Sequence, residues 1–285
     1  MNLHLDNLKI QNAHEDNLSI PIRDLHTVII DNYKSVFSVQ LMNALTQANV
    51  NVVLCDVEHN PATLIIPQSG NKQHPKILRN QIDWSEEQKE LVQQKIVQSK
   101  IKNQIELLVS EEMQMHAVES LKRFSAQVEP GDLGNREGLA SKMYFRALFG
   151  ADFKRFMDDP KNWALNYGYA ILRSQLSKAI IAKGMSPALG IFHKGPTNHF
   201  NLTDDLIEPF RPIVDWYVYN HITDDTFFSK HKKMEIIELT TKKVYFNDER
   251  QTLFNAMNLY VDNFWKYMIG QTDTLKSPII DFHEF

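Results

Sequence analysis

Residues 84–108 read WSEEQKELVQQKIVQSKIKNQIELL, and this stretch decides the class of the fold. Apolar residues recur in it at intervals of one to five positions within a sequence rich in lysine, glutamine and glutamate; they include Leu91, Val92, Ile96, Ile101, Ile105 and Leu108. Such spacing places apolar side chains on one face of a helix. The stretch therefore predicts a long amphipathic helix and a helical region that begins near residue 84.

Helical patterns continue beyond this stretch toward the C-terminus. Further helices are expected at five places: residues 111–128, 137–149, 163–183, a segment that starts near Asp205, and residues 248–268. Gly184 directly follows the third of these and Pro187 comes soon after, which is typical of a helix end. The second part of the chain is therefore predicted to be all-α.

The first part of the chain shows a different pattern. Short runs rich in valine and isoleucine alternate with polar turns, which is typical of β-strands. The expected strands cover residues 3–10, 18–22, 27–31 and 50–56, with one helical stretch over 36–48. We therefore expect a small β domain that precedes the helical one.

The two patterns meet in residues 67–84, where Pro67, Gly70 and Pro75 lie among polar residues. Prolines and glycine in such surroundings suit a linker better than the interior of a helix or strand. The predicted class is α+β. Its parts are a small, sandwich-like N-terminal β domain over residues 1–75, a linker over 76–84, and a larger all-α domain over 85–285.

Composition places the chain among ordinary globular proteins, with 43% hydrophobic and 23% charged residues in 285. The N-terminus, MNLHLDNLKIQN, lacks a basic segment followed by an apolar one, and no run of about 18 apolar residues occurs. We expect a cytoplasmic protein with no membrane contact.

The chain has a single cysteine, Cys55, which lies in an expected strand. It is therefore interpreted as a core residue rather than part of a disulfide or zinc site.

The formal net charge of −4 gives no indication of a nucleic-acid partner, which usually shows as a basic excess. Affinity for a polyanion depends on local basic patches, however. The candidate patches contain Lys230, Lys232 and Lys233, and then Lys242 and Lys243; ordinary solvated lysines are the alternative. The sequence has no glycine-rich phosphate loop, paired CxxC motif or internal repeat, so several common enzyme classes lose support.

Glu137 shares one face of its expected helix with the apolar residues Ala140 and Tyr144. Burying a carboxylate costs roughly several kcal/mol unless a cation or hydrogen-bond donors lie beside it. A metal ion is one such cation. The alternative is an ordinary helix-start residue, because Glu137 follows Gly134 and Asn135 and would favour the N-terminal dipole.

The apolar run LGIF (189–192) ends at His193, where the chain is expected to turn. A histidine in this place is able to offer one ring nitrogen to a metal while the other is held by the backbone. The alternative is a structural histidine. His199 would allow a zinc-binding pair with His193, but no HExxH-type spacing supports that interpretation.

Asp205 and Glu208 are three residues apart in TDDLIEPFR (203–211), so they share a helix face. One interpretation is a capping box, with Asp205 as N-cap and Glu208 as its partner; the other is metal binding, and for Glu208 the two are compatible. Pro212 is expected to kink or end the helix. Two carboxylates and one histidine suit a hard divalent ion such as Mg²⁺ or Mn²⁺.

Several of these segments resemble those of the CRISPR adaptation integrase family, in particular its type II branch. The segments that carry the resemblance are QKIVQSKIKNQ (94–104), GNREGLASKMYFRALFG (134–150), NWALNYGYAILRS (162–174), LGIFH (189–193) and FNLTDDLIEPFRPIVD (200–215). They span most of the chain in the order and spacing of the family. Phe192 departs from the pattern, since some type II relatives have a histidine there, but His193 stays aligned.

The resemblance implies a β domain that forms a homodimer and a helical domain that carries catalysis. It also implies a metal ion, Mg²⁺ or Mn²⁺, held by Glu137, His193 and Glu208, with Asp205 as a secondary neighbour. The implied reaction is a transesterification in which the 3′-hydroxyl of a short captured DNA attacks a phosphodiester at the leader-proximal repeat. Metal-dependent endonuclease activity is expected when water takes the place of the hydroxyl.

Double-stranded DNA and a small ferredoxin-like adaptation protein are the implied partners, the latter in a heterohexamer with two dimers of this chain. Other type II adaptation and effector proteins are further candidates. Lys142, Arg146 and Arg211 lie on the motif segments and are candidate contacts to DNA phosphates, or equally members of surface ion pairs.

Two other functions fit the same residues. A structure-specific, metal-dependent nuclease of DNA repair would use the same ligands without integrating DNA. A DNA-binding scaffold that has lost catalysis is the second alternative, and the presence of Glu137, His193 and Glu208 argues against it.

Overall fold

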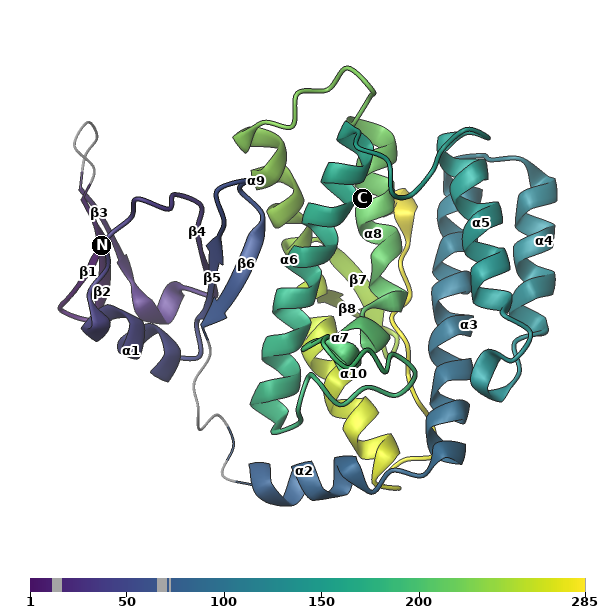
Figure 1. Cartoon of the computed structure of the whole chain (residues 1–285), viewed down its shortest axis with the longest axis horizontal. Coiled ribbons are helices and arrows are strands. Elements are labelled where there is room, and N and C mark those ends of the chain that lie inside the picture. The colour runs from purple at the N-terminus through teal and green to yellow at the C-terminus, as the bar shows by residue number, and fades with distance from the viewer. Residues whose placement is uncertain (12–16, 66–70, 72, 285) are drawn as a thin grey trace. The chain divides into compact units, whose positions relative to one another are not determined.

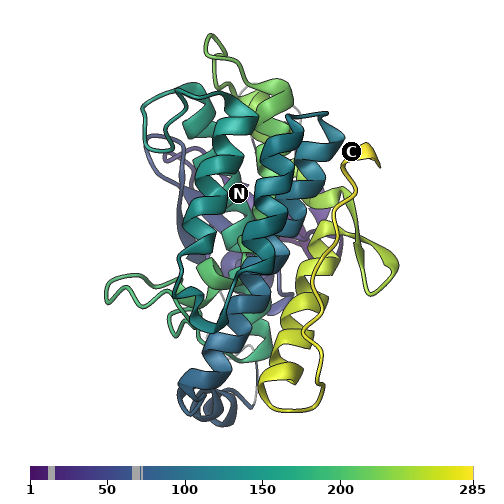
Figure 2. The same ribbon diagram turned by 90° about the vertical axis from the view of Figure 1, so that its right-hand side faces the viewer.

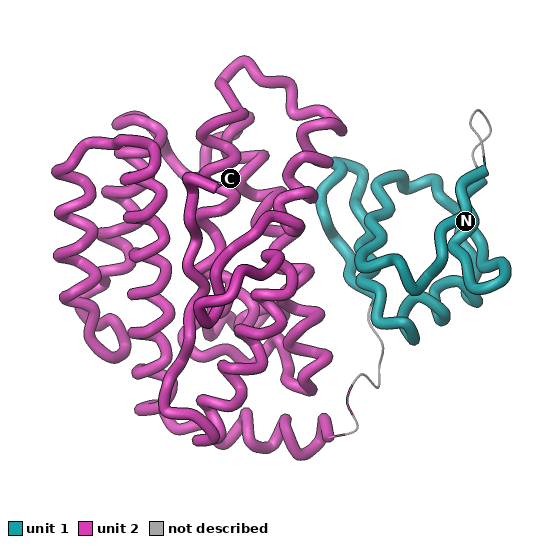
Figure 3. Tube along the Cα trace, turned by 180° about the vertical axis from the view of Figure 1, so that it is seen from behind, with its two compact units in different colours: residues 1–70 teal, residues 71–285 magenta. Residues whose placement is uncertain are grey.

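The computed structural model describes residues 1–11, 17–65, 71 and 73–284. The chain forms two compact units, Met1–Gly70 and Asn71–Phe285 (Figure 3). The first unit contains β-strands and a helix, and the second is mostly helical (Figure 1). The predicted α+β class and the order of its two parts are therefore confirmed.

Unit 1 is built from two small sheets. In the first sheet, β1 (Asn2–His4), β2 (Asn7–Ile10) and β3 (Leu18–Pro21) pair antiparallel in this order. In the second sheet, β5 (Asn51–Cys55) lies parallel to β4 (Thr27–Ile30) and antiparallel to β6 (Pro61–Ile65).

Both sheets share one core with helix α1 (Val39–Gln47). The side chain of Ser38 begins this helix by accepting a hydrogen bond from the backbone N–H of Leu41 at 3.2 Å. Leu41 and Leu45 are completely buried and lie in one cluster with Leu8 of β2 and Val52 of β5. The predicted sandwich-like domain is present, with α1 as part of its core.

Two details of unit 1 differ from the prediction. Residues 3–10, expected as one strand, form a hairpin, because Leu5 and Asp6 adopt positive φ angles of 48° and 58° that suit a two-residue turn. Strand β6 was not expected; it lies at the edge of its sheet and leaves most of its residues at least partly exposed, so no apolar pattern marks it. Cys55 is buried, as predicted.

Unit 2 contains the helices α2 (His74–Ile82), α3 (Glu86–Ser110), α4 (Met115–Ala126), α5 (Arg136–Phe149), α6 (Pro160–Lys183), α7 (Asn201–Leu206), α8 (Arg211–His221), α9 (Lys230–Glu238) and α10 (Leu253–Met268). The long helix predicted from residues 84–108 is α3, and it starts with a capping box formed by Ser85 and Gln88. Helices α3, α4 and α5 lie side by side (Figures 1 and 2).

Helix α6 is buried along most of its length and packs against α8 and α10. Asp159 caps its start by accepting a hydrogen bond from the N–H of Asn162 at 2.7 Å, and Gly184 ends it with a φ of 94°, as predicted. Gly168 lets α8 approach closely, since a Cβ there would lie 2.4 Å from Cγ1 of Val214. This contact fixes the spacing between α6 and α8.

The predicted domain boundaries need correction. The two units divide between Gly70 and Asn71, before the predicted end of the β domain at residue 75. Residues 76–84, expected to be a linker, belong to unit 2 and form most of α2, which tolerates Pro75 in its first turn. Residues 67–70 and 72 of the proposed linker region lie outside the described residues.

The second domain is not purely α. Strands β7 (Lys243–Phe246) and β8 (Glu249–Thr252) form an antiparallel hairpin, so the helix expected over 248–268 begins only at Leu253. Ile279 pairs with Tyr245 of this hairpin, and the C-terminal segment runs alongside α10 (Figure 2). No helix in the described ranges is long and apolar enough to cross a membrane.

We expect Gly168→Ala to destabilise the protein by about 1 to 3 kcal/mol, because the added methyl group overlaps Val214 in a packed contact. Urea unfolding followed by circular dichroism measures the free energy. The double variant Gly168→Ala/Val214→Ala is the control, since it removes the overlapping atoms, and its loss should be smaller than the two single losses combined. A double variant that loses the full combined amount would contradict the close contact.

Candidate active site

Three elements that are far apart in the sequence meet at Lys100 of α3. Its Nζ lies 2.7 Å from Oε1 of Glu137, in the first turn of α5, and 2.7 Å from Oε2 of Glu208, in the short 3-10 helix η3 (Glu208–Phe210). The Lys100 side chain is 11% exposed, and those of Glu137 and Glu208 are 24% and 5% exposed. Two of the predicted metal ligands thus converge on one buried cation.

The N-terminus of α5 places Glu137. Asn135 caps this helix by accepting a hydrogen bond from the N–H of Gly138 at 3.3 Å. Asp132 accepts hydrogen bonds from the N–H groups of Arg136 and Glu137 at 2.8 and 3.0 Å. Because these bonds satisfy the donors of the first turn, the Glu137 carboxylate is not needed as a cap and reaches Lys100 instead.

Helix η3 places Glu208 between α7 and α8. The single helix expected here is interrupted before Arg211, and Pro212 lies in the first turn of α8 rather than inside a longer helix. Asn103 of α3 donates a hydrogen bond to the carbonyl oxygen of Pro209 at 2.8 Å, which holds η3 against α3. The turn therefore presents Glu208 to Lys100 from a fixed backbone.

Asp205 holds the loop that carries His193. It lies inside α7 with a fully buried side chain, so the alternative interpretation of Asp205 as an N-cap is wrong. Its Oδ1 accepts hydrogen bonds from the backbone N–H of His193 at 3.0 Å and from the ring Nδ1 at 2.7 Å, and its Oδ2 accepts one from the N–H of Ile191. With both oxygens engaged, Asp205 orients His193.

Nδ1 of His193 is engaged with Asp205, so Nε2 is the ring nitrogen that is able to ligate a metal. The hydrogen bond with Asp205 raises the pKa of His193 above its usual value, while burial raises the pKa of the Asp205 carboxyl. The charges of His193 and Glu208 also act on each other's pKa, which places the ring near Glu208.

Burial disfavours the charged forms of Lys100 and Glu208, but the charges of neighbouring side chains outweigh this effect on both pKa values. The two glutamates hold the pKa of Lys100 above its usual value despite the desolvation of the ammonium group. Arg211, whose Nε lies 3.0 Å from Oε1 of Glu208, acts with Lys100 to hold the pKa of Glu208 below its usual value. Both Lys100 and Glu208 are therefore charged at neutral pH.

Among the described residues, no three histidine, cysteine, aspartate or glutamate side chains are close enough together to hold a metal ion as they stand. The Lys100 ammonium fills the space between the two carboxylates. The donor set nevertheless fits Mg²⁺ or Mn²⁺, since two carboxylates converge on one cation beside an imidazole. Oε2 of Glu208 is buried, and the Lys100 ammonium lies 2.7 Å from it.

A further buried carboxylate supports the site. Asp215 of α8 accepts hydrogen bonds from the hydroxyls of Tyr144, at 2.9 Å, and of Tyr169. Arg211 lies over the Tyr169 ring, 4.5 Å from its centroid, and so connects Asp215 to Glu208. Burial raises the pKa of Asp215 to about 6, although the two hydroxyls lower it. Lys100, Asp215 and Tyr169 were not predicted as site residues.

Two of the predicted DNA contacts, Lys142 and Arg146, line a basic pocket of about 430 Å³. Lys154 and Arg155 add two further cations, and the other lining residues are Ser141, Phe145, Ala151 and Phe153. Arg155 lies 5.2 Å from the centroid of the same Tyr169 ring that Arg211 covers, so the pocket adjoins the carboxylate site. Arg211, the third predicted DNA contact, is mostly buried and paired with Glu208.

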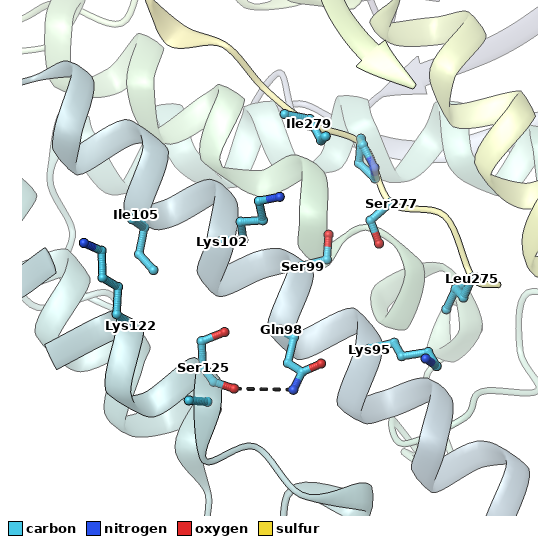
Figure 4. A pocket seen from close by; sticks show the side chains of 12 residues that line it. Lys95, Gln98, Ser99, Lys102, Ile105, Lys122, Ser125, Leu275, Ser277 and Ile279 are labelled. Carbon is cyan, nitrogen blue, oxygen red and sulfur yellow. Dashed lines mark hydrogen bonds between the residues drawn. The ribbon is translucent and has the colours of Figure 1, made fainter. Parts of the chain in front are cut away.

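A separate groove of about 650 Å³ crosses α3 between α4 and the C-terminal segment 275–279 (Figure 4). Lys95 and Lys102 of α3 and Lys122 of α4 line it, and Lys122 pairs with Glu119 at 3.0 Å. At 100° per residue, Lys95 and Lys102 project roughly 140° and 160° away from Lys100 around the helix. The groove and the carboxylate site therefore occupy different faces of α3.

The lysine clusters expected as basic patches are partly engaged within the protein. Lys233 is buried over the ring of Tyr167, and Lys232 pairs with Glu235 at 3.0 Å. Lys242 lies over the ring of Trp216. Lys230 and Lys243 are exposed. These positions therefore form no continuous basic surface, in contrast to the pocket at Lys142 and Arg146.

Asp215 gives the stability of the protein a dependence on pH. Its pKa rises from an ordinary value of 3.8 to about 6 on folding, so the folded state favours the protonated acid. This stabilisation is fully present below about pH 3.8 and is lost as the pH rises through about 6. We expect the unfolding free energy of the wild type, relative to Asp215→Asn, to fall by about 3 kcal/mol across that interval. Urea unfolding at a series of pH values measures the difference, and a constant difference would contradict the expectation.

Comparison with known proteins identifies the family of this chain. The profile of the family described as CRISPR associated protein Cas1 matches residues 1–256. The CRISPR-associated endonuclease Cas1 of Neisseria meningitidis serogroup C (strain 8013) is 36% identical to it over 215 residues, which are 75% of this chain and 70% of that protein.

Solved structures share the fold. A casposase bound to integration product matches with a TM-score of 0.75 at 20% identity, over 100% of this chain and 91% of that one. A chain of a Cas6-RT-Cas1–Cas2 complex matches with a TM-score of 0.73 at 20% identity, over 97% of this chain and 34% of that one. At these identities the likeness concerns the fold alone. The match to the family profile and the identity to the Neisseria protein show that the chain belongs to the Cas1 family of CRISPR-associated proteins. This confirms the resemblance predicted from its motifs.

Proposed function

We propose that this protein is a metal-dependent DNA integrase of CRISPR spacer acquisition. It joins the 3′-hydroxyl ends of a short captured DNA to the leader-proximal repeat by transesterification, and it cleaves DNA when water replaces the hydroxyl. The observation that carries the proposal is the convergence of Glu137 and Glu208 on one cation near His193. Membership of the Cas1 family supports it, and the relative from Neisseria meningitidis is named an endonuclease.

Glu137, His193 and Glu208 are the proposed ligands of a Mg²⁺ or Mn²⁺ ion. When bound, such an ion polarises the scissile phosphate and stabilises negative charge on the leaving 3′-oxygen. Asp205 keeps Nδ1 of His193 protonated and so leaves Nε2 as the ligating atom. Arg211 keeps Glu208 ionised and fixes the position of its second oxygen.

The basic pocket beside the site is the proposed contact for the end of the DNA. Lys142, Arg146 and Lys154 are suited to phosphates, and Phe145 and Phe153 are suited to stacking with an unpaired base. Because Arg155 and Arg211 share the ring of Tyr169, DNA held in this pocket lies next to the carboxylates.

The groove along α3 is a second proposed contact, for the backbone of a duplex. Its lysines, Lys95, Lys102 and Lys122, accompany serine and glutamine side chains that are able to donate hydrogen bonds to phosphate oxygens (Figure 4). Since this groove occupies a different face of α3 from Lys100, it binds DNA away from the reacting bond.

We also propose that unit 1 forms a homodimer and that two such dimers flank a small ferredoxin-like partner in a heterohexamer. Unit 1 exposes several large apolar side chains, with exposed fractions from 62% to 80%; they include Tyr33, Val36, Val39 and Val57. Exposed apolar side chains of this kind are suited to a protein contact. One chain with the same fold comes from a complex that contains Cas2.

We expect His193→Ala to lower the joining of a short duplex to supercoiled repeat DNA by at least about 100-fold, or about 2.7 kcal/mol, because the ion loses its imidazole ligand. A gel assay with Mn²⁺ and the partner protein measures joined products. His199→Ala is the matched control, since His199 is exposed and only six residues away, and it should join DNA like the wild type.

Equal joining by His193→Ala and His199→Ala would overturn the metal assignment. Cleavage by the wild type without any joined product would favour a repair nuclease over an integrase. A wild type that binds DNA but neither joins nor cleaves it would favour a scaffold.

We expect Lys142→Gln/Arg146→Gln to weaken DNA binding and to lower its dependence on salt. Each phosphate contact contributes about 0.9 to the slope of log affinity against log salt, so the slope should fall by about 2. Fluorescence anisotropy with a labelled duplex at several salt concentrations measures it. Lys230→Gln/Lys243→Gln removes the same charge from exposed lysines outside the pocket and should leave the slope unchanged. Equal slopes for the two double variants would contradict the pocket assignment.

A further inference from the structure

Lys100 occupies the place in which a metal ion bound by both Glu137 and Glu208 would have to lie. Its Nζ is 2.7 Å from an oxygen of each carboxylate. A buried lysine needs anionic partners, because desolvation opposes its charge. The two glutamates supply them, since Lys100 donates a hydrogen bond to Glu137 and pairs with Glu208. Lys100 is therefore an ammonium ion in the metal-free protein.

The two glutamates are already matched by two resident cations. Lys100 and Arg211 carry two positive charges, and Glu137 and Glu208 carry two negative ones. A divalent ion bound to the same two carboxylates would raise the positive charge beside them from two to four. The two glutamates carry only two negative charges, and like charges repel strongly in a largely buried space. One cation then has to move away.

Of the two resident cations, Lys100 is the one that is able to leave. Arg211 is held on two sides, by Glu208 at 3.0 Å and by the ring of Tyr169 at 4.5 Å. Lys100 ends in a compact ammonium group on a flexible four-carbon stem. Its partners are the two carboxylate oxygens on which the proposed ion would bind, so a divalent ion is able to replace both contacts.

We infer that Lys100 is an internal counterion that holds the metal position in the metal-free protein and leaves it when a divalent ion binds. The inference rests on the proposed function, because it takes Glu137 and Glu208 as metal ligands. Lys100 thus keeps two like charges together while the helices fold, and it lowers the affinity for the metal by competing for the same oxygens.

A Mn²⁺ titration followed by electron paramagnetic resonance tests this on the full chain. Lys100→Met keeps much of the side-chain volume and removes the competing charge, so we expect Mn²⁺ to bind at least about tenfold more tightly than to the wild type. Lys102→Met makes the same change at an exposed lysine of the same helix and should stay within about twofold of the wild type. Equal or weaker binding by Lys100→Met would overturn the inference.

A measurement on the wild type does not depend on how a variant folds. Acetic anhydride labels accessible amines, and peptide mass spectrometry reports the label at each lysine. Lys100 should be protected relative to Lys102 without Mn²⁺, and it should react at least about fivefold faster with saturating Mn²⁺, while Lys102 is unchanged. An unchanged rate at Lys100 with Mn²⁺ bound would overturn the inference.

Failure of the proposed metal site would give a different result. His193→Ala should lose Mn²⁺ affinity whether or not Lys100 moves. If the wild type binds Mn²⁺ no better than His193→Ala, the metal assignment fails and the inference fails with it. If His193→Ala binds more weakly but both Lys100 measurements stay unchanged, only the inference fails.

Discussion

The contact of Lys100 with Glu137 and Glu208 is the interaction on which the rest of the site depends. It joins α3, the first turn of α5 and η3, and removing one member would leave a buried charge unpaired at a cost of about 3 to 5 kcal/mol. Local hydrogen bonds prepare it: Asp132 satisfies the start of α5, and Asn103 holds η3. Apolar packing brings the helices together, and this group of charges fixes which residues face one another.

The sequence predicted the long elements well, because many residues contribute to one periodic pattern. Helix α6 was expected over 163–183 and occupies Pro160–Lys183, with its end set by Gly184 as predicted. Strand β6 and the β7–β8 hairpin were not expected, since β6 and β8 have no fully buried residue and β7 is only four residues long. Helix α2 was interpreted as a linker because Pro75 and polar residues dominate it, although a proline is tolerated in a first turn.

The sequence pointed to several residues of the proposed site, but not to the contacts that connect them. Each of Glu137, His193 and Glu208 had an ordinary alternative when taken alone, and only the order of the motifs favoured one choice. Asp205 was predicted as a secondary neighbour of the metal, with a helix cap as the alternative, because spacing along a helix cannot show that its partner lies in the loop before it. One signal for Lys100 was available, since the buried positions 96, 100, 103 and 107 follow helical spacing and a lysine interrupts this stripe.

The formal charge of −4 misleads for a physical reason, because a partner meets surface charge and not the sum over the sequence. The buried charged residues of the described chain are five acids and two lysines: Asp132, Asp204, Asp205, Glu208, Asp215, Lys100 and Lys233. Their formal net charge is −3, and these acids are paired or hydrogen-bonded inside the protein. Most of the acidic excess therefore lies inside the protein. The cations of the pocket at Lys142 and Arg146 face outward without opposing carboxylates in its lining, which leaves this surface suited to a polyanion.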